Sequence, residues 1–328
     1  MASTLYPLKF TPILKEKVWG GNKIGKILNH NLEGVANCGE SWEVSGLIGD
    51  ESEISNGFLA GNNLNEILEV YLTDLVGEKN YEKYGLGFPL LIKFIDAHEN
   101  LSVQVHPDDG VAMEKYGQNG KTEMWHVVQA DEGAGLYVGF NRQVNEAVYL
   151  DAVENGTLEE LLRFHPVAKG DTFMIPAGTV HAIGKGVLLA EIQQSSDITF
   201  RIFDWNRVDE NGKSRELHYE EALESIDFAA NNADFRVGYT STPNKTVKLV
   251  RSPYFNTNLL EIDTTIVKSF ADIDSFVIYI CLEGHVHLVS DNFNEHVEAG
   301  DVFLVPAEIE EIKISCGVRS RLLEVFCS

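Results

Sequence analysis

The chain has 328 residues, with 50 acidic and 26 basic side chains and a formal net charge of −24. This length suffices for two domains, or for one large β domain with a smaller additional unit. The charge argues against nucleic acid and anionic membranes as partners. A phosphorylated small molecule remains compatible with it, provided that the binding site carries its own cations.

Cysteine usage and the N-terminal segment both indicate a cytoplasmic protein. The four cysteines lack Cys-x-x-Cys spacing and are expected to be reduced thiols. The segment "MASTLYPLKFTPILKEKVWGG" has no continuous apolar stretch of the kind found in signal peptides, and no run of 18 apolar residues occurs anywhere. We expect a monomer or a homodimer.

Short strands separated by Gly, Asp and Asn dominate the predicted elements. In chain order they include "LLIKFIDA", "LSVQVHP", "EMWHVVQ", "DTFMIP", "GVLLAEIQQ", "FVIYICLEGHVHLVS" and "DVFLVP". Such runs favour a β-sandwich or barrel over a parallel α/β sheet.

Helices are expected as additions to this β structure, at about residues 62–85, 143–165 and 215–228. In the first range, Asn63 and Glu66 have the spacing of a capping box ahead of a run with apolar residues at helical intervals. In the second range, Thr157 and Glu160 form the same start signal.

An internal repeat divides the chain. The stretch "GDTFMIPAGTVHAIG" begins at Gly170, and "GDVFLVPAE" begins 130 residues later at Gly300. At the position of His181 the second copy has Glu311. We therefore expect two β units, a larger one over residues 1–245 and a smaller one over 246–328, of which only the first keeps the histidine.

Three separated stretches of the first unit carry side chains suited to a metal ion. On a strand, "LSVQVHP" places Ser102, Gln104 and His106 on one face, because alternate side chains share a face. Glu123 begins the strand "EMWHVVQ", and His181 follows the Gly-Asp…Pro-Ala-Gly turn. Two imidazoles, one carboxylate and one amide can close around Zn²⁺, Fe²⁺ or Mn²⁺ and leave positions open for substrate.

The histidine-bearing turn resembles a cupin motif. The spacing G-x5-P-x-G-x2-H from Gly170 to His181 is similar to the second motif of cupin barrels, with Lys185 where an Asn is expected. The fold class that this resemblance implies is mainly β, with two cupin-type β-barrel (jelly-roll) units and a few added helices.

A more specific resemblance covers about two-thirds of the chain. The stretches "TPILKEKVWGG", "GESWEVSG", "FPLLIKFIDA", "LSVQVHPDD", "GKTEMWHV", "GDTFMIPAGTVHAIGKG", "EIQQSSDITFRIFDW" and "SRELH" occur in the order found in type I mannose-6-phosphate isomerases of the short bacterial form. The resemblance implies reversible isomerisation of D-mannose 6-phosphate and D-fructose 6-phosphate at one zinc ion per chain.

The resemblance also implies roles for individual residues. The zinc ligands would be Gln104, His106, Glu123 and His181, with Gln104 the weakest donor. Arg201 of "SSDITFR" matches the catalytic arginine of the family. The remaining site residues that we expect are the proton-carrier candidates Lys121, Glu191 and Asp197, and the substrate-binding residues Ser102 and Lys93.

These residue types suit the implied reaction. Moving a proton between C1 and C2 creates an enediolate, whose negative charge a metal ion and a guanidinium can stabilise. An Fe²⁺-dependent cupin dioxygenase and a non-catalytic sugar-binding cupin are the alternatives. In the second unit, His285 and His287 share a strand face, but no counterpart of His181 accompanies them, so we expect no second metal site.

Overall fold

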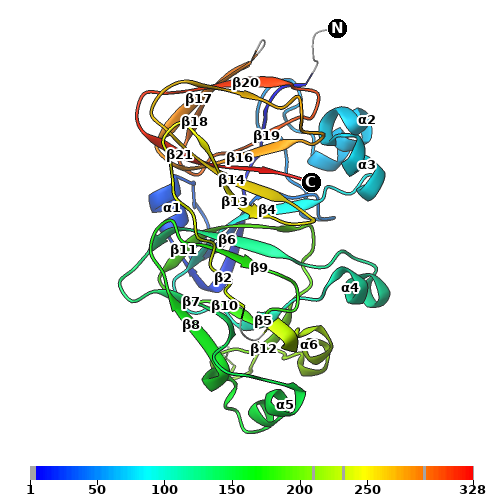
Figure 1. Cartoon of the computed structure of the whole chain (residues 1–328), viewed down its shortest axis with the longest axis vertical. Coiled ribbons are helices and arrows are strands. Elements are labelled where there is room, and N and C mark those ends of the chain that lie inside the picture. Colours follow the sequence, from blue (N-terminus) through cyan, green and yellow to red (C-terminus); the bar gives the residue numbers. More distant parts are fainter. Residues whose placement is uncertain (1–4, 209–210, 231–232, 291–292, 328) are drawn as a thin grey trace.

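The computed structural model describes residues 5–208, 211–230, 233–290 and 293–327. Within these ranges the chain is mainly β, and its strands form four antiparallel sheets (Figure 1). None of the helices described in these ranges has the length and apolar character needed to span a membrane.

The first unit consists of two facing sheets. One has the order β2 (Ile13–Gly21), β3 (Cys38–Val44), β4 (Leu90–Ala97), β11 (Val187–Gln194), β6 (Glu123–Ala130) and β9 (Thr172–Ile175). The other has the order β12 (Phe200–Phe203), β5 (Val103–Val105), β10 (His181–Ile183), β7 (Gly135–Phe140) and β8 (Leu162–Pro166).

The second unit repeats this arrangement with strands from both ends of the chain. Its larger sheet has the order β1 (Leu8–Lys9), β19 (Val302–Val305), β16 (Val277–Glu283), β21 (Ser320–Phe326), β14 (Asn256–Ile262) and β13 (Thr246–Arg251). Its smaller sheet has the order β15 (Ile266–Ser269), β20 (Glu311–Cys316), β17 (His285–Ser290) and β18 (Phe293–Glu298). Because β1 pairs with β19, the N-terminal segment contributes a strand to the second unit. The division of the chain at residues 245/246 stays a prediction.

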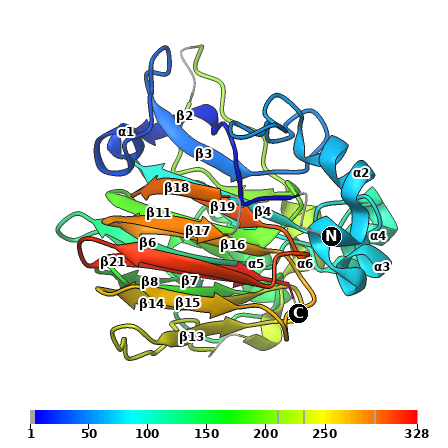
Figure 2. The same cartoon turned by 90° about the horizontal axis from the view of Figure 1, so that it is seen from above.

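The sheets stack in layers along the long axis of the molecule (Figure 1), and the view from above looks down this axis onto their strands (Figure 2). Side chains of the central strand β11 pack alternately on its two sides. Leu188 and Ile192 join an apolar cluster shared with β16 and β21 of the second unit, whereas Leu189 joins the cluster between the two sheets of the first unit. Alternation then turns Glu191 toward the interior of the first unit, because residues two apart on a strand share a face.

Helices lie around these sheets. They are α1 (Lys23–Leu28), α2 (Leu64–Val76), α3 (Glu78–Tyr84), α4 (Asp109–Tyr116), α5 (Glu146–Glu154) and α6 (Tyr219–Ser225), with short 3-10 helices at Leu158–Leu161 and Phe228–Ala230. The capping box predicted at Asn63 and Glu66 is confirmed at the start of α2. The capping box predicted at Thr157 and Glu160 is wrong. Thr157 makes no capping hydrogen bond and precedes only the four-residue 3-10 helix Leu158–Leu161, whereas Asn145 caps α5.

The internal repeat has matching local structure. Strands β9 and β19 occupy equivalent positions 130 residues apart, and Gly170 and Gly300 before them have φ angles of +93° and +100°. Such angles favour glycine, because a Cβ atom is poorly tolerated there. His181 begins β10 and Glu311 begins β20, so the two copies differ in chemistry at the same point of the fold.

Candidate active site

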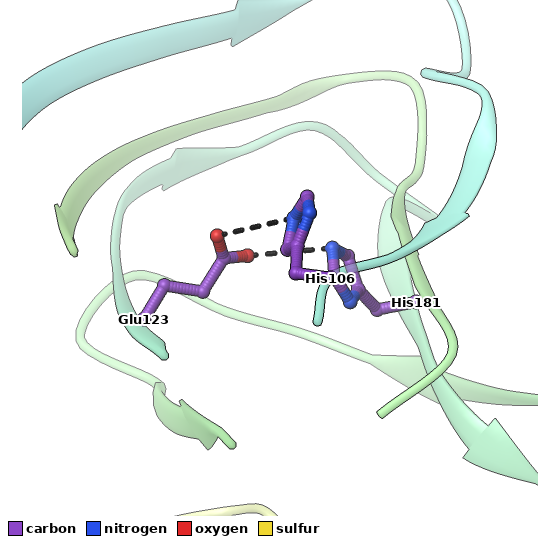
Figure 3. Close-up of side chains that lie close together, drawn as sticks. All are labelled: His106, Glu123 and His181. Carbon is purple, nitrogen blue, oxygen red and sulfur yellow. Dashed lines mark ion pairs between the residues drawn. The ribbon is translucent and has the colours of Figure 1, made fainter. Parts of the chain in front are cut away.

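Three buried side chains of the first unit converge between its two sheets (Figure 3). Glu123 begins β6, His106 follows β5 and His181 begins β10. Nε2 of His106 lies 3.5 Å from Oε2 of Glu123, and Nε2 of His181 lies 3.4 Å from Oε1 of the same carboxylate. The candidate ligand atoms all lie within 4.8 Å of one another.

Both imidazoles are oriented by backbone carbonyls. Nδ1 of His106 is 2.9 Å from the carbonyl oxygen of Ile198, and Nδ1 of His181 is 2.8 Å from that of Thr179. Since a carbonyl only accepts, each Nδ1 carries the proton and each Nε2 presents a lone pair to the carboxylate side. Burial lowers the pKa of His181 to about 4, which keeps its ring neutral.

These donors fit a metal ion. Within the described part of the chain, Nε2 of His181 and both oxygens of Glu123 are buried and accept no hydrogen bond. A buried polar atom without a hydrogen-bond partner is costly, so its retention calls for an explanation; of these three atoms, only Oε2 of Glu123 has a cation close by within the described residues, the Lys121 ammonium at 3.2 Å. Two neutral imidazole nitrogens and one carboxylate are the donor set of many divalent transition-metal sites.

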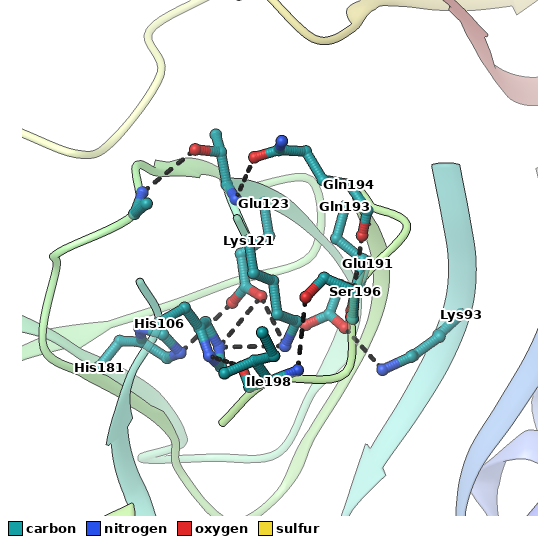
Figure 4. A network of polar contacts seen from close by, with 12 residues as sticks. Lys93, His106, Lys121, Glu123, His181, Glu191, Gln193, Gln194, Ser196 and Ile198 are labelled. Carbon is teal, nitrogen blue, oxygen red and sulfur yellow. Dashed lines mark hydrogen bonds and ion pairs between the residues drawn. The ribbon is translucent and has the colours of Figure 1, made fainter. Parts of the chain in front are cut away.

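The side chain of Lys121 lies beside the three donors (Figure 4). Its buried Nζ is 3.0 Å from Nε2 of His106 and 3.2 Å from Oε2 of Glu123. Lys121 therefore brings a positive charge within reach of the candidate ligands.

Gln104 occupies the middle of a row of facing residues. On β5 it is paired in register with His181 of β10 on one side and with Arg201 of β12 on the other. It also lines the cavity that Lys121 lines.

The guanidinium of Arg201 is half-buried and turned toward β5. Its Nε lies 3.3 Å from Oγ of Ser102, and its Nη1 donates to the carbonyl of Glu216 at 3.0 Å. The carboxylate of Asp204 is bound by Arg207 and Arg215 instead. The two predicted residues Ser102 and Arg201 are thus in contact.

Glu191 and Lys93 form a buried pair on neighbouring strands. Oε1 of Glu191 lies 3.5 Å from Nζ of Lys93, and its Oε2 accepts a 2.8 Å hydrogen bond from Nε1 of Trp125. Burial, followed by the nearby charge of Glu123, raises the pKa of Glu191. For Lys93, burial lowers the pKa but the carboxylates of Glu40 and Glu191 outweigh it, so the pKa is raised and the ammonium persists.

A cavity of about 320 Å³ lies next to the cluster and is lined by Lys93, Ser102, Gln104, Lys121, Glu191 and Arg201. Its lining includes five cationic side chains (Lys17, Lys93, Lys121, Arg201 and Arg215) and three acidic ones (Glu40, Glu191 and Asp197), with Asp197 exposed. A cationic cavity in a chain of net charge −24 is suited to an anionic ligand.

Sequence reasoning did not single out three of these residues. Lys17, Glu40 and Arg215 lie within the motifs "TPILKEKVWGG", "GESWEVSG" and "SRELH", so the signal was present without a role attached. Only the pairing of β2, β3 and β4 brings Lys17 and Glu40 beside Lys93.

Comparison with known proteins relates this site to one family. The family model described as "Phosphomannose isomerase type I, catalytic domain" matches residues 7–132, and "Mannose-6-phosphate isomerase, cupin domain" matches residues 245–322. The mannose-6-phosphate isomerase ManA of Bacillus subtilis is 33% identical over 95% of this chain and 96% of its own length. The mannose-6-phosphate isomerase of Streptococcus mutans is 37% identical over 76% of this chain and 77% of its own length.

Solved structures agree with this relationship. The crystal structure of the mannose 6-phosphate isomerase from Bacillus subtilis has a TM-score of 0.86 and 30% identity, covering 97% of this chain and 99% of that one. The structure of a mannosephosphate isomerase homologue from Archaeoglobus fulgidus, with a TM-score of 0.78 and 21% identity over 99% of this chain and 99% of that one, shares the fold. On the sequence matches and the shared structure, the chain belongs to the type I phosphomannose isomerase family and is an aldose–ketose isomerase of the cupin class.

Proposed function

We propose that this protein interconverts D-mannose 6-phosphate and D-fructose 6-phosphate by proton transfer through an enediol, at a site that holds one zinc ion. Family membership and the names of the Bacillus and Streptococcus relatives support the substrate. The observation that carries the proposal is the convergence of three buried atoms without hydrogen-bond partners, Nε2 of His181 and both oxygens of Glu123, beside a cationic cavity.

His106, Glu123 and His181 would hold the zinc ion, with the amide oxygen of Gln104 as a weaker fourth donor. When bound there, zinc would supply Lewis-acid polarisation of the substrate oxygens next to C1 and C2. The carbonyls of Ile198 and Thr179 support this role by fixing the tautomers of the two histidines.

The proton would be carried by a side chain of the cavity. Glu191 is the first candidate because its raised pKa brings the carboxylate closer to the range in which it can both take and return a proton. Lys121, beside the ligand cluster, and Asp197, at the exposed end of the cavity, are the other two.

Arg201 would stabilise the negative charge that develops on the enediolate. Among the described residues, the acceptors that its guanidinium binds, Ser102 Oγ and the carbonyl of Glu216, are neutral. Its charge is therefore available to a substrate oxygen.

Ser102 and Lys93 remain the proposed substrate-binding residues. Ser102 presents its hydroxyl to the Arg201 guanidinium, and Lys93 presents a buried ammonium to Glu191 and Glu40. We further propose a cytoplasmic enzyme, monomeric or homodimeric, that needs neither nucleic acid nor a membrane.

Metal analysis of the purified protein, combined with a coupled assay on mannose 6-phosphate, tests the proposal. We expect about one zinc per chain and isomerisation in both directions. Iron with substrate-dependent O₂ uptake would instead indicate a dioxygenase, and a metal-free protein without turnover would indicate a sugar-binding cupin.

A further inference from the structure

The start of β6 is held by a side chain of the neighbouring strand β11. Thr122 directly precedes Glu123, the first residue of β6, and Gln194 is the last residue of β11 (Figure 4). The backbone N–H of Gln194 donates to the carbonyl of Thr122 at 3.1 Å, and the N–H of Thr122 donates to the side-chain Oε1 of Gln194 at 2.8 Å. Thr122 and Gln194 are buried, with exposures of 5% and 4%.

The side chain of Gln194 replaces a backbone group of the sheet. In a hydrogen-bonded antiparallel pair, two facing residues normally exchange both of their backbone hydrogen bonds. Here the backbone carbonyl of Gln194 accepts from the N–H of Ser196 at 2.8 Å, and the side-chain oxygen accepts from Thr122 in its place. The pairing of the residue before Glu123 therefore depends on one amide side chain.

Thr122 also contacts the turn that precedes His181. Its Oγ1 accepts from the backbone N–H of Ala177 at 3.2 Å. The next residue of that turn, Gly178, donates its N–H to the carbonyl of His106 at 2.9 Å. The stretches that supply the three candidate metal ligands are thus joined by hydrogen bonds around Thr122, so a displacement of Thr122 would alter the distances between the ligands.

The other end of the Gln194 amide leads to the second unit. Its Nε2 donates to Oδ1 of Asp109 at 2.9 Å, and Oδ2 of Asp109 accepts from the hydroxyl of Tyr254 at 2.8 Å. Tyr254 lies between β13 and β14 of the second unit. Burial alone would raise the pKa of Asp109, but the hydrogen bonds from Gln194 and Tyr254 outweigh it and lower the pKa, so Asp109 stays ionised.

An amide suits the position between Thr122 and Asp109. The backbone N–H of Thr122 needs an acceptor and the carboxylate of Asp109 needs a donor, and a glutamine side chain offers one of each. An apolar side chain would leave a buried N–H unpaired, and a carboxylate would face Asp109 with like charge.

We infer that Gln194 is a positioning residue for the proposed metal site, because it holds Thr122 and with it the start of β6, where Glu123 lies. Asp109 and Tyr254 extend this support to the second unit, which thereby contributes to a site that lies wholly in the first. The inference rests on the proposed function, since the segment that Gln194 holds carries one of the residues that would bind the metal.

The test compares Gln194→Ala with the matched control Asn80→Ala. Asn80 is also a buried amide between the units, and it donates to the carbonyl of Val76 and to Oγ of Ser275. Gln194→Ala should weaken zinc binding, measured by chelator competition, by about 10-fold or more, as loss of a group that orients a ligand does. Asn80→Ala should lower the free energy of unfolding but keep the zinc affinity within about 2-fold, because it shares no partner with the site.

Hydrogen exchange of the Thr122 amide in the metal-free protein is the second measurement. Exchange should be faster in Gln194→Ala than in the wild type, because the acceptor of this N–H is removed. Gln194→Glu should also exchange faster, since a carboxylate then faces Asp109. Adding Asp109→Asn to Gln194→Glu supplies a donor for that carboxylate and should restore slow exchange.

The inference would be overturned by a Gln194→Ala variant with the zinc affinity and Thr122 exchange of the wild type. Equal losses of zinc affinity in Gln194→Ala and Asn80→Ala would overturn it too, because they would indicate general loosening of the fold. Tyr254→Phe should weaken zinc binding in the same direction by a smaller factor, and an unchanged affinity would remove the second unit from the inference. If Gln194→Ala does not fold, Gln194→Met, which keeps the volume, replaces it with the same expected results. Neither measurement needs turnover, so inactivity on mannose 6-phosphate would reject the proposed function while leaving both decisive for Gln194.

Discussion

Nζ of Lys121 lies 3.0 Å from Nε2 of His106, the same nitrogen that faces the carboxylate of Glu123. A single imidazole lone pair can accept a hydrogen bond from an ammonium or bind a metal ion, but it cannot do both at once. Lys121 and a metal ion therefore compete for His106. Since Lys121 also lines the cavity, metal binding is expected to direct its ammonium toward the substrate.

This competition predicts opposite effects on metal affinity and turnover. Lys121→Gln removes a positive charge 3.2 Å from the carboxylate of Glu123 and thereby removes repulsion of the metal ion. Its zinc affinity, measured by chelator competition, should equal or exceed that of the wild type, while isomerase activity falls. Weaker zinc binding in Lys121→Gln would contradict this relationship.

The three buried donors should matter more for metal retention than the amide. His106→Ala, Glu123→Ala and His181→Ala are each expected to lose zinc and turnover, because each removes a strong donor from a three-donor site. Gln104→Ala should retain measurable zinc. Metal content after dialysis is the measurement, and full zinc occupancy in His181→Ala would show that the ligand assignment is mistaken.

The side chains that share a strand face could be predicted from the sequence, because alternation is a local property. Val103 and Val105 pack in a cluster with residues of α5 and α6, while Gln104 lines the cavity, as the pattern "SVQVH" indicates. The internal repeat was also predictable, because the turn before each strand is a local feature. Gly170 and Gly300 both have a positive φ angle, which favours glycine at both positions.

Contacts that depend on strand order could not be predicted in this way. Glu40 reaches Lys93 only because β3 pairs with β4, and β1 joins the sheet of the second unit through its pairing with β19. Such pairings are decided by burial of whole sheets against one another, which a single stretch of sequence does not encode.

The buried pair of His30 and Glu43 should make stability depend on pH. Nε2 of His30 lies 2.9 Å from Oε1 of Glu43, and its Nδ1 lies 2.9 Å from the carbonyl of Leu28. Burial alone would lower the pKa of His30, but the carboxylate of Glu43 outweighs it and raises the pKa from 6.5 to about 9. A raised pKa stabilises the fold fully below the unfolded value of 6.5, and this contribution is lost as the pH rises through about 9.

The free energy of unfolding should therefore fall between pH 6.5 and 9, by about 3 kcal/mol at most from this pair. Glu43→Gln should be less stable than the wild type at pH 6.5, and the difference should shrink toward pH 9. Chemical denaturation of the zinc-loaded proteins across this range measures it. A difference between the two proteins that stays constant with pH would contradict the assignment to His30.

Arg201 is expected to act on the reaction and not on metal binding. Its guanidinium contacts Ser102 and the Glu216 carbonyl, and none of the three donor atoms of the metal cluster belongs to it. Arg201→Ala should lower kcat by about 100-fold or more while the zinc content stays unchanged, as the removal of a transition-state donor does. Arg201→Lys, which keeps the charge but loses the planar group, should recover part of the activity; a metal-free Arg201→Ala would point to a structural role instead.

The hydrogen that moves between C1 and C2 is expected to travel as a proton and not as a hydride. A hydride shift requires both substrate oxygens to be held by metal, and enzymes that use it generally employ two ions bridged by carboxylates. The cluster within the described residues offers one carboxylate, Glu123, while Glu191 and Lys121 line the cavity and are the candidates to carry a proton. Turnover in deuterated water should therefore place solvent deuterium at C2 of mannose 6-phosphate or at C1 of fructose 6-phosphate. Incorporation can be partial if the buried carboxyl of Glu191 returns the original proton before that proton exchanges with solvent. Glu191→Gln should reduce turnover and exchange together, whereas many turnovers without any deuterium, in an enzyme that also stays active as Arg201→Ala, would favour the hydride route.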